Sequence, residues 1–183
     1  MLTEDGLHVA FNSTKEKNKN LEEKAKKIKL VLTDNDGVLT DTGVYYSEKG
    51  EELKRFSIRD GMGVERLRNL VNIKTVIITG ELSGSVKKRA EKLKIDELYL
   101  GAKSKESLLD EILRKNRLKH ENIAFIGDDV NDIELIKIVG LTAAPSDAMQ
   151  DILKIVDFVC EHKGGNGAFR EFAELLITFN TKE

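Results

Sequence analysis

Short apolar runs rich in β-branched residues alternate along this chain with amphipathic stretches, and this alternation constrains the fold more than any other feature. The runs are KLVLT (29–33), KTVIIT (74–79), ELYL (97–100), NIAFIG (122–127), LTAA (141–144) and DFVC (157–160). Apolar runs without polar alternation are typical of strands whose two faces are both covered by helices. The pattern therefore predicts a three-layer α/β sandwich around a mostly parallel sheet with right-handed crossovers.

The stretches between these runs predict the helices and one hairpin. Apolar residues recur at helical spacing within 64–71, 86–93, 108–113 and 169–176. Residues 43–57 differ, because they read as two strands around a Glu48-Lys49-Gly50 turn. An insertion directly after the loop of the first strand projects over the carboxyl edge of the sheet, where open α/β sheets bind ligands. We expect this hairpin to be a lid or an oligomer contact.

The amino-terminal part is different in composition. Residues 13–27 are polar and lysine-rich, and only Leu21 and Ala25 are suited to face an apolar surface. A frayed helix and a flexible tether both fit this segment, and a solvated extension is favoured over a binding arm. We assign residues 1–27 to a polar N-terminal extension and residues 28–183 to one domain, since 183 residues suit a single domain.

Charge and cysteine content narrow the classes of protein. The net charge of −2 gives no overall basic field, so we expect neither nucleic acid nor an anionic membrane as partner. No run of about 18 apolar residues exists to span a membrane. The only cysteine, Cys160, has no partner for an intrachain disulfide, which favours a reducing compartment. We therefore expect a cytoplasmic protein.

Acidic residues follow two of the predicted strands. The first strand ends in Asp34-Asn35-Asp36-Gly37 and the fourth in Gly127-Asp128-Asp129-Val130-Asn131-Asp132. Adjacent parallel strands would bring four carboxylates together: Asp34, Asp36, Asp128 and Asp129. Unit charges about 4 Å apart repel by about 4 kcal/mol at an effective dielectric constant of about 20, so a cation is expected among them. An all-oxygen donor set without His or Cys favours Mg²⁺ over zinc.

Two further features predict an anion site at the same edge. Thr79-Gly80 follows the second run and offers a hydroxyl and a backbone N–H. Lys105 is expected to open a helix that Ser104 caps, and a helix N-terminus with a lysine suits phosphate. Each residue alone is common at turns and surfaces, but their order along the strand ends favours a functional site.

The combined motifs resemble the haloacid dehalogenase superfamily of phosphotransferases from Lys29 to Leu176. The narrower likeness is to the capless phosphatases of 3-deoxy-2-ulosonic acid phosphates, both eight-carbon octulosonate 8-phosphates and nine-carbon nonulosonate 9-phosphates. The resemblance implies a Rossmann-like sandwich without a cap domain. The matching segments are DNDGVLTD (34–41), GEELKRFSIRDGMGV (50–64), IITG (77–80), KKRAEKLKI (87–95), GDDVND (127–132) and GGNGAFREFAELL (164–176).

This resemblance also implies roles for individual residues. Asp34 is expected to be the nucleophile that forms an aspartyl-phosphate, and Asp36 the general acid and base. Mg²⁺ would be held by the carboxylates of Asp34 and Asp128 and the backbone carbonyl of Asp36. The remaining expectations are Asp129 beside the metal, Asp132 orienting Lys105, and Thr79, Gly80 and Lys105 binding the phosphoryl group. Asn35 departs from the usual apolar residue, with little effect expected.

The residues expected to select the sugar give a mixed result. Glu81 stands where octulosonate phosphatases carry Arg, and together with Lys92 it resembles the nonulosonate phosphatases. The Arg59-Asp60-Gly61 triplet resembles the octulosonate enzymes. Arg89 and Lys92, three apart on one helix, are candidates to bind the substrate carboxylate, although a solvated basic face explains them equally. We favour a nine-carbon substrate, with Glu81 as the selector.

Assembly follows from the lack of a cap in the resembled family. Its relatives close their sites with neighbouring subunits, so we expect a homotetramer built on the 43–57 hairpin and the 164–167 glycine stretch, although a plain helix entry explains the glycines equally. One alternative is a catalytically inactive phosphatase-like tetramerisation module, but that would require loss of the catalytic acids. A phosphoacceptor receiver domain is the other alternative, and its acids and lysine occur in a different order along the chain.

Overall fold

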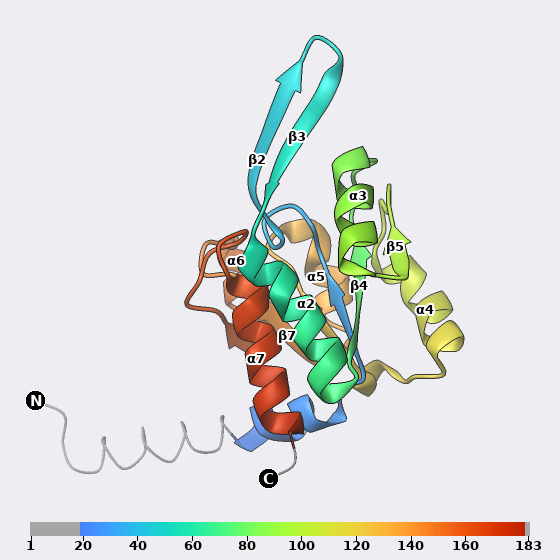
Figure 1. Cartoon of the computed structure of the whole chain (residues 1–183). Helices are drawn as coiled ribbons and strands as arrows, with labels where there is room; N and C mark the ends of the chain where they lie inside the picture. Colours follow the sequence, from blue (N-terminus) through green and yellow to red (C-terminus); the bar gives the residue numbers. More distant parts are fainter. Residues whose placement is uncertain (1–18, 182–183) are drawn as a thin grey trace, which may run out of the picture.

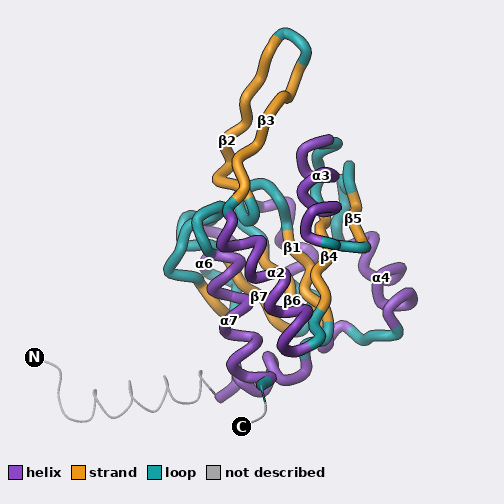
Figure 2. Tube along the Cα trace, viewed as in Figure 1, coloured by secondary structure: helices purple, strands orange, loops and turns teal. Residues whose placement is uncertain are grey.

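The computed structural model describes residues 19–181, which build one sheet, its flanking helices and a projecting hairpin (Figures 1 and 2). The six strands are parallel in the order β5-β4-β1-β6-β7-β8. Each lies in one of the six apolar runs, which confirms the predicted parallel sheet. Their bounds are β1 Leu30–Thr33, β4 Lys74–Ile78, β5 Glu97–Tyr99, β6 Ile123–Ile126, β7 Leu141–Ala144 and β8 Phe158–Val159.

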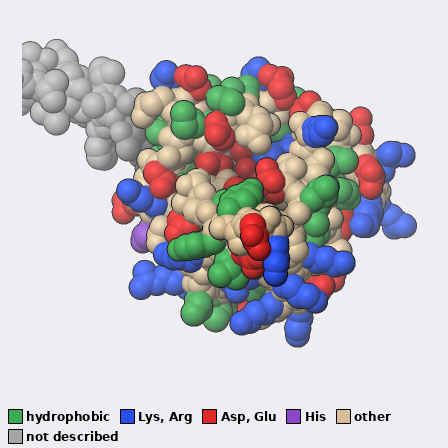
Figure 3. Space-filling model, turned by 90° about the horizontal axis from the view of Figure 1, so that it is seen from above, with side chains coloured by type: hydrophobic (Ala, Val, Ile, Leu, Met, Phe, Trp, Pro, Cys, Tyr) green, Lys and Arg blue, Asp and Glu red, His purple; other side chains and the backbone are tan. Residues whose placement is uncertain are grey.

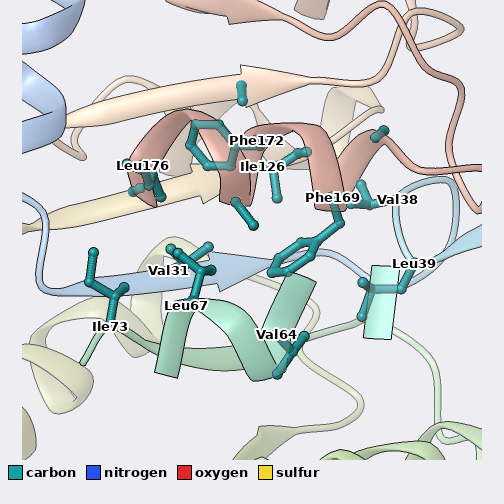
Figure 4. Close-up of a cluster of buried hydrophobic side chains, with 14 of the residues drawn as sticks. Val31, Val38, Leu39, Val64, Leu67, Ile73, Ile126, Phe169, Phe172 and Leu176 are labelled. Atoms are coloured by element: carbon teal, nitrogen blue, oxygen red, sulfur yellow. The ribbon is translucent and has the colours of Figure 1, made fainter. Parts of the chain in front are cut away.

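Helices cover both faces of this sheet and make the three layers. One face carries α2 (Ile58–Val71), α3 (Gly84–Leu93) and α7 (Ala168–Asn180), and the other carries α4 (Leu109–Asn116), α5 (Ile133–Ile136) and α6 (Gln150–Leu153). Successive strand residues alternate between the two cores. Val31 of β1 packs with Leu67 of α2 and Phe172 of α7 (Figure 4), whereas Leu32 packs on the opposite face. Because both faces are apolar, the strands show no polar alternation.

The predicted hairpin is present and stands away from the sheet (Figure 1). It consists of β2 (Thr40–Ser47) and β3 (Gly50–Phe56), which pair antiparallel. Gly50 has a φ of +105°, a conformation that glycine adopts without steric cost at the turn. The hairpin begins three residues earlier than predicted, because Thr40 already pairs with Phe56.

The described part of the N-terminal extension is a helix packed on the domain. Residues 19–27 are helical, Ala25 is fully buried, and Leu21 packs against the same core. Asn180 Nδ2 of α7 donates to the Ala25 carbonyl at 3.0 Å. These contacts favour the helix over the tether for this stretch, while residues 1–18 lie outside the described residues. None of the helices within 19–181 is long and apolar enough to cross a membrane.

The glycine stretch before α7 packs against the loop that follows β1 in the same chain. A Cβ on Gly164 would lie 1.8 Å from the Gly37 carbonyl oxygen, and one on Gly165 would lie 2.5 Å from the Asp41 nitrogen. Only glycine permits this approach. The stretch therefore packs directly on the loop that carries the first acidic motif.

Candidate active site

The two acidic motifs meet at the carboxyl edge of the sheet. β1 and β6 are neighbours, and the Asp34 N–H donates to the Ile126 carbonyl at 3.0 Å, so the loops after the two strands leave side by side. Carboxylate oxygens of Asp34, Asp128 and Asp132 all lie within 4.8 Å of one another. Figure 3 looks onto this edge, where acidic side chains gather beside the base of the hairpin. Of the four acids predicted to meet, Asp34 and Asp128 are in this group, and its third member is Asp132. Asp36 and Asp129 lie outside the group but line the same cavity.

A cavity of about 220 Å³ opens above this cluster. The residues that line it come from both acidic motifs, from the loop after β4 and from the start of the hairpin. Its lining comprises Asp34, Asp36, Thr42, Thr79, Gly80, Glu81, Asp128, Asp129 and Asn131. The cavity therefore unites most of the residues that the sequence singled out.

Lys105 supplies the positive charge at the floor of the site. Its side chain is 1% exposed, and Nζ lies 2.9 Å from Asp34 Oδ2 and 2.6 Å from Asp132 Oδ1. Burial alone would lower the pKa of Lys105, but the charges of Asp34 and Asp132 outweigh it and raise that pKa. The ammonium therefore stays charged beside the predicted nucleophile.

The expected helix start at Lys105 is wrong. Lys105 precedes a short 3₁₀ segment, Glu106–Leu108, and α4 begins only at Leu109. The Ser104 hydroxyl donates to the Glu106 carboxylate instead of capping a helix, because that carboxylate lies within reach two residues on. The positive charge at the site thus comes from the Lys105 side chain and not from a helix N-terminus.

Asp132 and Asp129 hold the second acidic loop in place. Asp132 is fully buried; its Oδ1 accepts from Lys105, and its Oδ2 accepts from the Asp128 N–H at 3.0 Å. The predicted contact between Asp132 and Lys105 is therefore present. Asp129 is exposed at the cavity, and its carboxylate accepts from the Val130 N–H at 2.6 Å.

The electrostatics of the cluster fit a divalent cation. Burial raises the pKa of Asp34 to about 7, despite the opposing effect of Lys105. Burial, together with the charges of Asp34, Asp132 and Asp129, raises the pKa of Asp128 to about 8. Asp128 Oδ1 is buried, and no donor among residues 19–181 reaches it. An unpartnered carboxylate oxygen in an acidic, all-oxygen cluster is a suitable ligand for Mg²⁺.

The loop after β4 supplies the predicted anion ligands. Thr79 is 1% exposed, and its hydroxyl oxygen accepts from the Glu81 N–H at 3.2 Å. Gly80 and Glu81 follow it at the rim and line the cavity. Three of the residues predicted to contact phosphate or sugar are thus at the site.

Two predicted substrate residues are not among those that line the cavity. Arg89 donates from Nη2 to the Ser57 carbonyl at 2.7 Å, and its guanidinium lies 5.6 Å from the centroid of the Phe56 ring. Lys92 is exposed in the last turn of α3. Because Arg89 is engaged by the end of the hairpin, the pair does not point together to one ligand within this chain.

The Arg59-Asp60-Gly61 triplet, which resembles the octulosonate enzymes, lies in the first turn of α2. Asp60 is 1% exposed and accepts from the Gly167 N–H at 3.1 Å and the Arg170 N–H at 2.9 Å. It thereby joins the start of α2 to the start of α7. A Cβ on Gly61 would lie 2.4 Å from Arg89 Nη2. Asp60 and Gly61 therefore support packing between helices.

Sequence reasoning missed Lys54 of β3. Its side chain is 1% exposed, and Nζ lies 2.6 Å from Asp36 Oδ1 and 3.5 Å from Glu51 Oε2. Burial opposes its charge, but the hydrogen bond and charge of Asp36 raise the pKa of Lys54. The only signal in the sequence was strand alternation, which turns Lys54 inward between the exposed Leu53 and Arg55.

The comparisons with known proteins agree with this site. The haloacid dehalogenase-like hydrolase family matches residues 91–172. The 3-deoxy-D-manno-octulosonate 8-phosphate phosphatase KdsC of Salmonella typhi is 40% identical over 154 residues, which covers 84% of this chain and 81% of the relative.

Solved structures of similar proteins share the fold. The 3-deoxy-D-manno-octulosonate 8-phosphate phosphatase of Yersinia pestis has a TM-score of 0.84 at 36% identity, covering 88% of this chain and 86% of that one. The corresponding enzyme of Moraxella catarrhalis, in complex with magnesium ion, phosphate ion and a KDO molecule, has a TM-score of 0.84 at 32% identity, with 87% and 91% covered.

Proposed function

The chain belongs to the haloacid dehalogenase-like hydrolases, in the family of 3-deoxy-D-manno-octulosonate 8-phosphate phosphatases, and from this premise we propose that it hydrolyses the phosphate monoester of a 3-deoxy-2-keto sugar acid. The observation that carries the proposal is the contact of Lys105 with Asp34 on the floor of a cavity lined by Thr79 and Asp128. In phosphoryl transfer, the positioning of groups and the compensation of charge contribute more to catalysis than other effects do.

The first chemical step transfers the phosphoryl group to the protein. The Asp34 carboxylate attacks phosphorus, the bond between phosphorus and the sugar oxygen breaks, and the sugar oxygen takes a proton from the Asp36 carboxyl group. The products are the free sugar acid, an aspartyl-phosphate on Asp34 and an ionised Asp36. Lys105 and the hydroxyl of Thr79 hold the phosphoryl oxygens during this transfer.

The second step releases phosphate. The Asp36 carboxylate takes a proton from water, the oxygen of that water bonds to phosphorus, and the bond between phosphorus and Asp34 breaks. Inorganic phosphate leaves, and both carboxyl groups return to their starting states. The carboxylates of Asp34 and Asp128 and the Asp36 carbonyl would hold Mg²⁺, with Asp129 nearby, and the ion would supply positive charge that lets these acids and the phosphate coexist.

The substrate that we propose first is 3-deoxy-D-manno-octulosonate 8-phosphate, because the Salmonella typhi relative carries that name at 40% identity. The sequence-based preference for a nine-carbon nonulosonate 9-phosphate remains a second candidate. It is supported by Glu81, which lines the cavity, whereas its predicted companion Lys92 does not. Glu81 suits hydrogen bonds from sugar hydroxyls better than contact with a carboxylate.

We propose that the chain assembles as a homotetramer in which the hairpins meet around a central axis. The hairpin extends away from the body (Figure 1) and leaves Tyr45, Tyr46 and Leu53 more than half exposed. An apolar surface of this kind is suited to burial between subunits. Sedimentation velocity should show a tetramer, and Leu53→Asp should yield smaller species. A fully active monomer would overturn the assembly.

We propose the cytoplasm as the compartment. Cys160 is a free thiol buried next to α7, and burial raises its pKa well above the usual range. Such a thiol is unreactive. The proposal rests on the single cysteine in the sequence, since a chain that can form no intrachain disulfide is typical of a reducing compartment.

The experiment that tests the function is a substrate panel. Phosphate release is measured with Mg²⁺ on the eight- and nine-carbon ulosonate phosphates and on an aryl phosphate. Efficient turnover of either sugar phosphate supports the proposed class. Turnover of the aryl phosphate alone would reject the sugar class, and no turnover with any of the three would reject the phosphatase.

A further inference from the structure

The two carboxylate oxygens of Asp36 have very different surroundings. Oδ1 accepts from Lys54 Nζ at 2.6 Å, from Asn35 Nδ2 at 3.1 Å and from Thr40 Oγ1 at 3.3 Å. Oδ2 is buried, and no hydrogen-bond donor among the described residues reaches it. Three donors keep Oδ1 as an acceptor, so the oxygen that is able to carry a proton is Oδ2.

The strongest of the three donors comes from the hairpin. Lys54 is the only one that is charged, its distance is the shortest, and its side chain is 1% exposed. A buried ammonium is stable only when it is paired. The position of Lys54 is therefore tied to Asp36, and the position of the Asp36 carboxylate is tied to the hairpin.

A second contact joins this pair to the other side of the cavity. Glu51 Oε2 lies 3.5 Å from Lys54 Nζ, and Glu51 Oε1 accepts from the Ser83 hydroxyl at 2.5 Å. Ser83 caps α3, whose start directly follows the loop that carries Thr79 and Gly80. Through Lys54 and Glu51, strand β3 thus contacts both Asp36, in the loop after β1, and Ser83, at the start of α3.

From these contacts we infer that Lys54 is a positioning residue that holds Oδ1 of Asp36 and directs proton transfer to Oδ2. This inference rests on the proposed function, in which Asp36 gives a proton to the sugar oxygen and later takes one from water. Lys54 does not touch the substrate in either step. Its loss leaves the Asp36 carboxylate free to rotate, so both proton transfers slow. The attack of Asp34 on phosphorus keeps its rate only when the leaving group needs no proton.

The test compares Lys54→Met with wild type on two substrates. A sugar phosphate has a poor leaving group and requires the proton, so kcat should fall about 10²-fold or more, within the range that general acid–base catalysis contributes, while KM stays within about threefold. 4-Nitrophenyl phosphate has a leaving group that requires no proton. Its first turnover should stay near the wild-type rate, and slow hydrolysis of the aspartyl-phosphate should then give a burst of one nitrophenolate per site.

Two further variants serve as controls for this comparison. Lys74→Met changes an exposed lysine at the amino end of β4, on the opposite edge of the sheet, and should match wild type in every measurement. Lys54→Arg keeps a charged donor, so its kcat should be at least about tenfold higher than that of Lys54→Met. Should Lys54→Met fail to fold, Lys54→Gln, which keeps most of the length, takes its place in the burst experiment.

The outcomes separate the inference from the proposed function. A wild-type enzyme that hydrolyses neither substrate rejects the function itself. An active wild type whose Lys54 variants lose the first turnover and the steady state equally on both substrates, or lose nothing, rejects only the positioning role. A burst in Lys54→Met that is absent in wild type supports it.

Discussion

Nζ of Lys105 lies 2.9 Å from Oδ2 of Asp34, and both side chains are almost completely buried. The lysine thus neutralises one carboxylate of a cluster that otherwise contains only acids. Lys105→Met removes this charge and leaves Asp34 and Asp132 unpaired, which should lower the free energy of unfolding by about 3–5 kcal/mol. Urea denaturation measures the loss. Lys115→Met, which breaks an exposed pair with Glu97, should cost less than about 1 kcal/mol. Equal losses of the free energy of unfolding in the two variants would contradict the conclusion that Lys105 neutralises the buried acids.

The acidic cluster predicts a distinctive pH dependence in the metal-free protein. The pKa values of Asp34 and Asp128 are raised to about 7 and about 8 from 3.8, so the folded chain binds these protons more tightly than the unfolded chain. Between about pH 4 and pH 8 the folded state therefore holds more protons, and stability should rise as the pH falls. Mg²⁺ competes with the same protons, so its affinity should weaken in that direction.

Thermal denaturation in the presence of a chelator measures this effect. The melting temperature should be higher at about pH 6 than at about pH 8, and Asp128→Asn should flatten the difference. A chelated wild type that becomes more stable as the pH rises through this window would show that the cluster is not protonated in the absence of metal.

The glycine stretch before α7 gives a test of close packing. Gly164→Ala places a Cβ 1.8 Å from the Gly37 carbonyl oxygen, and because that atom is backbone the loop must shift. We expect a loss of about 1–3 kcal/mol, as for other overpacked sites. Gly84→Ala is the matched control, because its Cβ meets nothing within 4 Å. Equal stability of the two variants in chemical denaturation would contradict this contact.

Glu81 is the candidate for sugar selection. A carboxylate at the rim disfavours a nearby substrate carboxylate, so Glu81→Arg should change the ratio of kcat/KM for the eight- and nine-carbon substrates by at least about tenfold, about 1.4 kcal/mol. Glu91→Arg, on the exposed surface of α3 beside Lys88, should leave that ratio unchanged. An unchanged ratio in Glu81→Arg would remove Glu81 as the selector.

The sequence predicted the sheet well because its strands are covered on both faces. In β1 every residue is buried, so no polar alternation obscures the run, and the acids that follow it must meet those after β6 at one edge. The contact of Lys105 with Asp132, which the family resemblance implied, is also present.

The misses concern long side chains and local hydrogen bonds. The spacing of Arg89 and Lys92 fixes a shared helix face, but the Ser57 carbonyl and the Phe56 ring decide where the Arg89 guanidinium lies. Those partners lie outside α3, so the sequence pattern of α3 does not predict the contact. Lys54 was missed for the same reason, since only the folded hairpin brings it to Asp36.

The central claim is that Asp34 is the nucleophile of a Mg²⁺-dependent phosphatase acting on a sugar acid phosphate. The most direct measurement is phosphate release from 3-deoxy-D-manno-octulosonate 8-phosphate by wild type and by Asp34→Asn. Each protein is assayed with a chelator and then with Mg²⁺ restored. Asp110→Asn, at an exposed position of α4, is the control. We expect wild-type and control activity to vanish with chelator and return with Mg²⁺, and folded Asp34→Asn to stay inactive throughout. Phosphate release by Asp34→Asn above a few per cent of the wild-type kcat, or full wild-type activity with chelator, would contradict the account.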